Sequence, residues 1–286
     1  MDGRLAAGVD VGATLAKLAL RNSEGELRFD SLPSQEIPGL CERLEEFAPQ
    51  TLGVTGCGAA AFAEAWGRPT QRVIEFEAWG RGSRSFLEAQ GAESEEPFLL
   101  ISLGTGTSVL QIAPGETLRL GGTALGGGTV MGLGRVLADC SNYEELCELA
   151  TRGVRGRVDL LVGDIYQNEE IPLPGDLTAA SFGNLGRSQE LGGDRLAPRR
   201  EDLAAAIMGL VGENVGLICC GLGRMAGIER LVYGGSTVHG NPSLLSILVG
   251  VTAATGLKPV ILENGRFSGA LGALELACEK PGSGAS

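Results

Sequence analysis

The sequence lacks the features that mark nucleic-acid binding and membrane insertion. It has 23 Lys and Arg residues and 35 Asp and Glu residues, which gives a net charge of −12, and no basic run occurs. Nucleic acid and anionic membrane surfaces are therefore disfavoured as partners. No uninterrupted apolar stretch reaches the roughly 18 residues of a membrane span, and Asp10 interrupts the apolar run near the start. We therefore expect a soluble, cytoplasmic protein.

Metal-ligand spacings and the common nucleotide motifs are also missing. The seven cysteines include no CxxC pair, and the single histidine, His239, is not at metal-ligand spacing from any of them. This pattern predicts reduced thiols and no structural zinc. The P-loop pattern GxxxxGK[ST] does not occur. The glycines of 221–227 follow an expected helix rather than a strand, which argues against a dinucleotide-binding fold.

Glycine, in contrast, is abundant. It accounts for 46 of the 286 residues, more than twice the usual share of about 7%. The glycines are concentrated in four segments, at 104–108, 121–134, 221–227 and 234–240. Such clustering is not typical of disorder, and it predicts several turns whose backbone lines a common ligand.

The alternation of apolar, polar and turn residues predicts an α/β protein of two lobes, each opening with a β-hairpin. The charged segment 92–97 marks their boundary, so we expect an N-terminal lobe over 1–96 and a C-terminal lobe over 97–280. Residues 281–286 are expected to form a flexible tail.

A long helix is expected over 200–227 in the second lobe. It is apolar over much of its length, more than one sheet face usually buries, and it therefore predicts a homodimer. Asn214 is interpreted as a core or interface amide within an apolar stripe. The stripe comprises Leu203, Ile207, Leu210, Val211, Asn214 and Ile218.

Two segments have the composition that bound phosphates require. Phosphates need close backbone N–H donors, hence glycines, together with hydroxyl donors and one carboxylate that holds a metal ion through water. The segments "DVGAT" (10–14) and "GTGTS" (104–108) each supply glycine and hydroxyl groups between apolar strands. Lys17 adds an ammonium group as a point charge. Either segment alone is equally consistent with a tight turn, but the two together favour phosphate binding.

The two hairpins resemble those of the superfamily of sugar kinases, actin and heat-shock ATPases. Five further segments resemble the type II pantothenate kinases, in the order of that family, and extend the resemblance over about residues 6–277. They are "VIEFEAWGRG", "LRLGGTALGGGTVMGLG", "GDLTAASFGN", "RLVYGGSTVHGNP" and "GRFSGALGAL". The resemblance implies a two-lobed actin-like (ribonuclease H-like) fold, each lobe a β-sheet flanked by helices, with the nucleotide in the cleft.

The resemblance also implies an activity, the ATP-dependent phosphorylation of pantothenate to 4′-phosphopantothenate, the first step of coenzyme A biosynthesis. Glu75 would be the catalytic carboxylate that accepts the proton of the attacking hydroxyl, and Asp10 would hold Mg²⁺ through water. Arg119 would pair with the pantothenate carboxylate. The other implied substrate-binding residues are Glu75, Ser108, Ala180 and Phe267, of which Phe267 replaces a tyrosine common in the family. The implied ATP-binding residues are Asp10, Gly12, Thr14, Lys17, Gly104, Thr105, Gly106, Thr107, Gly127, Gly128, Gly234, Gly235 and Ser236.

Partners follow from the same resemblance. It implies a homodimer in which "LTAASFG" (177–183) lies near the substrate site of the partner, and it is compatible with an acyl-CoA feedback ligand. Other interpretations stay open at this point. Without the resemblance, Glu75 would be an exposed strand-end acid paired with Arg81, and His239 a turn residue.

Two further classes of protein also remain. A non-catalytic binding or regulatory module of the coenzyme A pathway would lack the equivalents of Glu75 or Arg119, and both are present. A dehydratase-activating ATPase of the same superfamily would need paired thiolates for an iron–sulfur cluster. Cys140 and Cys147 are seven residues apart and lack the expected glycine flanks.

Overall fold

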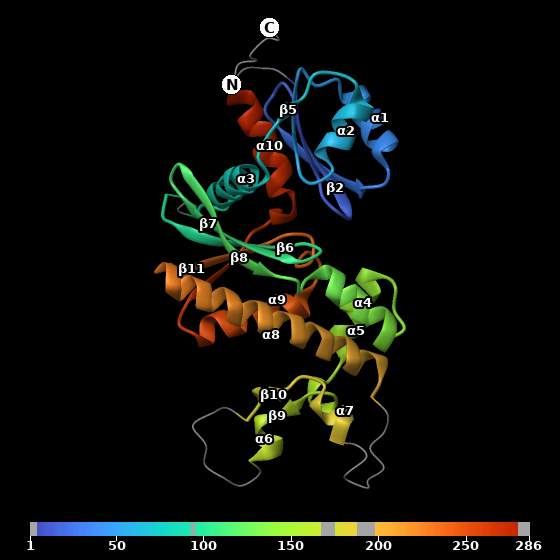
Figure 1. The fold of residues 1–286 in the computed structure, drawn as a ribbon, viewed down its shortest axis with the longest axis vertical. Helices are drawn as coiled ribbons and strands as arrows, with labels where there is room; N and C mark the ends of the chain where they lie inside the picture. Colours follow the sequence, from blue (N-terminus) through green and yellow to red (C-terminus); the bar gives the residue numbers. More distant parts are fainter. Residues whose placement is uncertain (1–4, 93–94, 167–174, 188–197, 280–286) are drawn as a thin grey trace.

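The chain forms two five-stranded sheets with helices packed on them (Figure 1). The computed structural model describes residues 5–92, 95–166, 175–187 and 198–279, so the expected tail at 281–286 lies outside the described residues. The first sheet has the strand order β3-β2-β1-β4-β5 and the second the order β12-β11-β6-β7-β8. In both, three consecutive strands pair antiparallel and two more join in parallel. The same topology therefore occurs twice, as the two opening hairpins predict.

The strands have the following bounds. The first sheet comprises β1 (Ala6–Val11), β2 (Leu15–Arg21), β3 (Leu27–Pro33), β4 (Thr51–Thr55) and β5 (Gln71–Arg72). The second comprises β6 (Phe98–Leu103), β7 (Thr107–Ala113), β8 (Glu116–Thr123), β11 (Arg230–Gly234) and β12 (Lys258–Ile261). Strand β1 is buried along its whole length, because helices cover both faces of the first sheet.

Helices α1 (Ile37–Phe47) and α2 (Ala59–Trp66) cover the outer face of the first sheet, while α3 (Glu75–Ala89) and α10 (Ser268–Glu279) lie between the two sheets (Figure 1). The C-terminal helix α10 thus contacts β1 and β4 of the first lobe, although it follows the second sheet in sequence. A Cβ atom at Gly8 would overlap the carbonyl oxygen of Ala270, and one at Gly272 would overlap that of Ala78. Part of the glycine excess therefore serves close packing around α10 and not a ligand.

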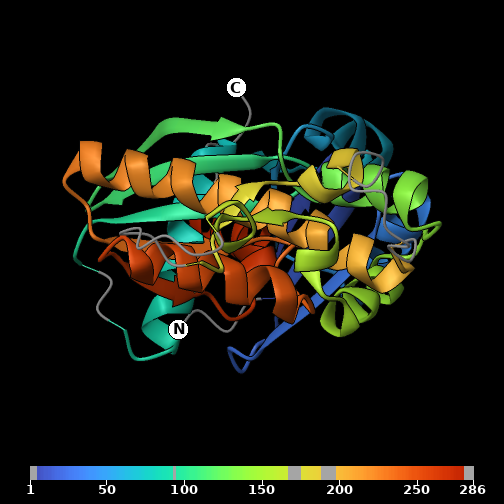
Figure 2. The same ribbon diagram turned by 90° about the horizontal axis from the view of Figure 1, so that it is seen from below.

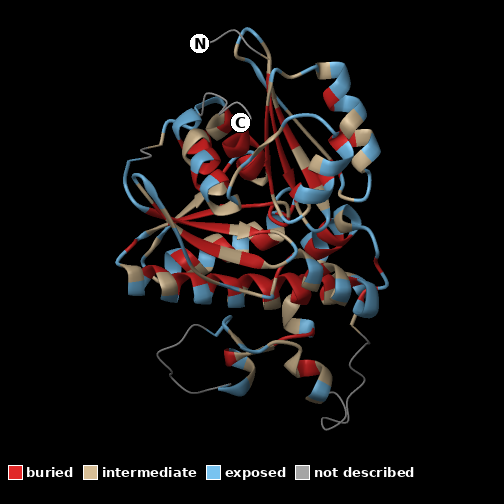
Figure 3. Cartoon of the chain, turned by 45° about the horizontal axis from the view of Figure 1, so that its top comes forward, coloured by how far each residue is buried: buried red, intermediate tan, exposed pale blue. Residues whose placement is uncertain are grey.

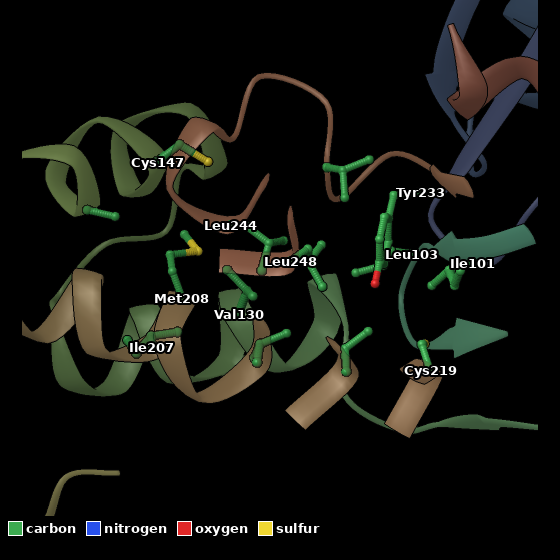
Figure 4. Close-up of a cluster of buried hydrophobic side chains, with 14 of the residues drawn as sticks. Ile101, Leu103, Val130, Cys147, Ile207, Met208, Cys219, Tyr233, Leu244 and Leu248 are labelled. Atoms are coloured by element: carbon green, nitrogen blue, oxygen red, sulfur yellow. The ribbon is translucent and has the colours of Figure 1, made fainter. Parts of the chain in front are cut away.

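The outer face of the second sheet is covered by α4 (Gly127–Leu137), α5 (Tyr143–Arg152), α8 (Arg200–Ala226) and α9 (Pro242–Ala254). Figure 2, seen from below, shows α8 and α9 side by side under this sheet. Their buried side chains interlock with Ile101, Leu103 and Tyr233 of the sheet (Figure 4). The buried Tyr233 hydroxyl is satisfied by the Thr252 hydroxyl at 2.6 Å. This core supports the strand ends at which the site is built.

The buried face of α8 differs from the expected stripe. The sequence pattern puts Asn214 and Ile218 in the core, but Asn214 is exposed and donates to the Leu210 carbonyl at 2.8 Å, and Ile218 is 40% exposed. The buried line is shifted by one residue and includes Ala204, Met208, Val211, Val215 and Cys219. Ile207 and Val211 are buried as predicted. The placement of Asn214 and Ile218 in the core was wrong, because the helix is apolar on almost every side and its periodicity does not define one face.

By length and composition α8 could also cross a membrane, with a mean hydropathy of 1.8 over its most apolar window. That window is 67% buried inside the protein, however, so α8 is the core helix of the second lobe. Figure 3 shows its buried face directed at the sheet and its other face exposed.

A small unit lies on the far side of α8 (Figure 1). It consists of η1 (Arg155–Arg157), β9 (Leu160–Leu161), α6 (Val162–Ile165), β10 (Thr178–Ala180) and α7 (Gly183–Arg187). Arg155 attaches this unit to the helix, because its guanidinium donates to Thr178 Oγ1 and to Glu213 Oε1 of α8, both at 2.8 Å.

Candidate functional site

A cavity of about 1180 Å³ is lined by residues of both lobes. All but two of the predicted site residues line it, although they come from six separate parts of the chain. They are Asp10, Gly12, Thr14, Lys17, Glu75, Gly104, Thr105, Gly106, Thr107, Ser108, Arg119, Gly127, Gly128, Gly234, Gly235 and Ser236. The fold therefore brings the two hairpins and the implied catalytic carboxylate to one place.

The first hairpin places a carboxylate and an ammonium group side by side. Asp10 and Lys17 are directly opposite in the β1–β2 register, and their Oδ2 and Nζ atoms are 3.6 Å apart. Asp10 is only 3% exposed. A Cβ atom on Gly269, near the start of α10, would come within 2.5 Å of Asp10 Oδ2. The carboxylate is thus enclosed by backbone, and its remaining open direction is into the cavity.

The second hairpin is fixed by the start of α4. The Gly127 and Gly128 N–H groups donate to the carbonyls of Gly104 and Thr105 at 2.8 and 2.9 Å. The Thr237 hydroxyl also donates to the Gly104 carbonyl, at 2.8 Å. These first N–H groups of the helix, which often bind anions, hold the hairpin here. The two glycines therefore shape the phosphate side of the cavity by supporting its loop.

The two hairpins meet across the cleft. The Thr14 and Thr105 hydroxyl oxygens are 3.1 Å apart and share a hydrogen bond, although both side chains are exposed. Each hydroxyl stands in a Gly/Thr turn that the sequence predicts to bind phosphate. The lobes are thus closed at this point, and both hydroxyls lie close enough to bind oxygens of the same polyphosphate chain.

Glu75 is the first residue of α3, and its side chain faces the same cavity. Burial raises the pKa of its carboxyl group, and the negative charge of Asp10 raises it further, while Lys17 opposes both effects. Arg81 is bonded instead to Glu275 and Glu279, so it is not the partner of Glu75. Among the described residues no guanidinium is paired with Glu75, and a carboxylate with a raised pKa in such a place is suited to accept a proton.

Arg119 and Ser108 lie on the adjacent strands β8 and β7. Arg119 extends over Gly122, where a Cβ atom would come within 3.1 Å of its Nη2 atom. Gly122 is in turn directly opposite Ser108 in the register. A guanidinium and a hydroxyl are thus held next to each other at the cavity, where they can bind a carboxylate.

Two predicted site residues do not line the cavity. Phe267 is 2% exposed and stacks on Phe29, with 5.1 Å between the ring centroids, so it is a core residue in this structure. Phe267 therefore occupies a packing position and does not contact the cavity. Ala180 is exposed on β10, in the small unit beyond α8.

Several lining residues are not identified by sequence reasoning: Trp79, Tyr143, Thr237, His239 and Arg266. Tyr143 donates to the Thr237 carbonyl and accepts from Asn241 Nδ2 at 3.0 Å, and burial raises its pKa. Its position just after the glycine-rich segment is the one signal that could have pointed to it. His239 lies in a turn, as expected, but that turn borders the cavity.

The repeated sheet topology with a Gly/Thr hairpin from each lobe at one cavity defines the class of two-lobed actin-like phosphotransferases and ATPases. Solved structures agree on the fold. The activator of 2-hydroxyisocaproyl-CoA dehydratase from Clostridium difficile matches with a TM-score of 0.63 at 16% identity, covering 96% of this chain and 94% of that one. A ROK family glucokinase from Streptomyces griseus matches with a TM-score of 0.58 at 14% identity, covering 96% and 100%. These likenesses show the fold alone.

Sequence comparison is more specific. The Fumble family matches residues 17–275. Type II pantothenate kinases from Staphylococcus aureus strains RF122 and USA300 are 35% identical over 269 residues, covering 94% of this chain and 98% of theirs. The chain belongs to the Fumble family of type II pantothenate kinases. The predicted family, fold and kinase class are therefore confirmed.

Among the described residues no group of three or more His, Cys, Asp or Glu is placed to hold a metal ion.

Proposed function

We propose that this kinase transfers the γ-phosphoryl group of Mg-ATP to the 4′-hydroxyl of pantothenate, giving 4′-phosphopantothenate and ADP at the start of coenzyme A synthesis. The observation that carries the proposal is the convergence of Glu75, Asp10 and Lys17 with both Gly/Thr hairpins on one cavity. The S. aureus relatives, which are named for this activity, support the choice of substrate.

Positioning and charge neutralisation dominate phosphoryl transfer. Backbone N–H groups and hydroxyls of the two hairpins hold the phosphate oxygens, and the Lys17 ammonium offsets their charge. The adenosine lies toward Gly234, Gly235 and Ser236. Glu75 accepts the proton of the substrate hydroxyl as that oxygen bonds to phosphorus and the bond to ADP breaks.

The residues present fit a magnesium ion that arrives with the nucleotide. Mg²⁺ keeps several waters and takes one or two carboxylates together with phosphate oxygens rather than an all-protein cage. Asp10 supplies one buried carboxylate, and it lines the cavity in which the phosphates would lie. When bound, the ion neutralises phosphate charge, and Asp10 would orient it through water.

The proposal is tested by ADP release with pantothenate, pantetheine and several sugars as acceptors. We expect turnover with pantothenate that depends on Mg²⁺ and stops when the metal is chelated. Mass spectrometry should find one added phosphoryl group on the acceptor. Turnover with a sugar and none with either pantothenate or pantetheine would contradict the proposal.

The protein is further expected to be a homodimer. Leu217, Ile218 and Met225 leave an apolar line on the outer face of α8, exposed by 58%, 40% and 86%. A second copy would cover this face and bring the 177–183 segment near its partner's substrate site. Light scattering at micromolar concentration should give twice the 29.5 kDa chain mass. Leu217→Lys with Met225→Lys should halve that mass, whereas Val136→Lys, at an exposed position on α4, should not.

A monomeric mass for the unaltered protein would contradict the dimer. A cytoplasmic location and an acyl-CoA feedback ligand remain predictions from the sequence.

A further inference from the structure

Arg266 is a cation in the cavity wall with an unsatisfied donor. It belongs to the short helix η2 (Gly265–Phe267) and lines the cavity. Its Nε atom is buried, and within the described part of the chain no acceptor meets it. Burial lowers the pKa of the guanidinium. Leaving a buried donor unpaired is unfavourable, and since Arg266 as a whole is half-buried, the rest of its guanidinium can meet a ligand in the cavity.

The guanidinium is braced from behind. Its Cζ atom is 4.6 Å from the centroid of the Phe267 ring. Phe267 is itself fixed by stacking on Phe29. Arg266 lines the cavity and Phe267 does not, so a guanidinium held over this ring can offer its other face to a ligand in the cavity.

The segment that carries Arg266 packs against the glycine-rich turn that follows β11. Gly265 packs against Gly234, since a Cβ atom on Gly265 would come within 3.0 Å of the Gly234 Cα. The positive charge of Arg266 contributes, after burial, to the lowered pKa of His239, which places the two side chains near each other. Arg266 therefore adjoins the 234–239 turn, whose glycines and Ser236 are the proposed adenosine side.

We propose that Arg266 is a nucleotide-specificity residue, which forms with Phe267 behind it the wall on which the purine base of the nucleotide stacks. The inference rests on the proposed use of ATP. A guanidinium stacks on any flat π system, and a bicyclic purine covers more of it than a pyrimidine does. The base is remote from the transferred phosphoryl group, so the contact strengthens binding without changing the chemical step.

Calorimetric titration of each protein with Mg-nucleotides, without any acceptor, tests the proposal. The unaltered protein should bind ATP and GTP more tightly than CTP and UTP. Arg266→Ala should weaken ATP binding about 5- to 150-fold, the range found for loss of one stacked base, and should remove the preference for purines. Arg266→Lys should weaken it almost as much, because an ammonium has no flat face. Inorganic tripolyphosphate, which has no base, should bind equally to all variants.

Arg230→Ala is the matched control, since Arg230 also lies over a phenyl ring, that of Phe98 at 5.9 Å, but does not line the cavity. It should bind ATP as the unaltered protein does. The proposal would be overturned if Arg266→Ala bound ATP as tightly as the unaltered protein, or if Arg266→Lys did so. If a variant lost affinity for ATP and for tripolyphosphate equally, Arg266 would contact the phosphates and not the base, which would also overturn the proposal. If the purine effect appears but pantothenate is not phosphorylated, the proposed function fails and this inference stands. If the unaltered protein binds no nucleotide, both fail.

Discussion

Glu75→Gln should lower kcat for pantothenate phosphorylation by about 10²- to 10⁴-fold, the usual contribution of a positioned general base. The amide keeps the shape of the side chain but cannot accept the proton. The Kd of Mg-ATP should change little, because Glu75 serves the acceptor hydroxyl and not the phosphates. Coupled ADP release and calorimetric ATP binding measure the two quantities separately.

Glu77→Gln is the control, since Glu77 is in the same first turn of α3 but is exposed and does not line the cavity. It should retain normal turnover. The raised pKa of Glu75 also predicts that kcat/KM for pantothenate falls as the pH drops through that pKa, because only the ionised form accepts a proton. A normal kcat in Glu75→Gln would remove this residue from the mechanism.

Stability gives a readout for Glu75 that is independent of activity. Its folded pKa lies above the unfolded value near 4.5, so the folded state binds the proton more tightly. The stabilising contribution of the protonated Glu75 to the free energy of unfolding is complete below the unfolded pKa, and it is lost as the pH rises through the folded pKa. Glu75→Gln should therefore melt at a higher temperature than the unaltered protein near pH 7, with a smaller gain at pH 4. If the difference in melting temperature between the two proteins were the same at pH 7 and pH 4, the charge of Glu75 would not be its cause.

Arg119→Ala should raise KM for pantothenate about 10- to 150-fold, because a charge-assisted bond to a carboxylate is worth about 1.5–3 kcal/mol. The chain carries a net charge of −12, so long-range attraction does not assist an anionic substrate. A local cation must hold it, and Arg119 lines the cavity beside Ser108. Pantetheine has no carboxylate and should be much less affected.

Steady-state kinetics with both acceptors and both proteins decides the role of Arg119. Arg135→Ala, at an exposed position on α4 outside the cavity, is the control and should leave both KM values unchanged. Equal losses for pantothenate and pantetheine would mean that Arg119 serves the nucleotide or the fold instead.

The sequence by itself determined the β-hairpin that opens each lobe and its Gly/Thr turn. These are local features, because a turn of glycine and hydroxyl residues between apolar strands folds back on itself wherever it occurs. The opposition of Asp10 and Lys17 follows from the register of that one hairpin. Family resemblance added Glu75, whose neighbours in sequence do not distinguish it from an ordinary surface acid.

Only the tertiary structure decided which faces are buried and which distant side chains meet. Helix α8 is apolar nearly all round, so packing against the sheet and α9, and not periodicity, selected its core face and left Asn214 exposed. Phe267 became a core residue because Phe29 of another strand stacks on it, and this left Arg266 to line the cavity. Such outcomes depend on contacts between separate segments of the chain, which no local pattern of side chains records.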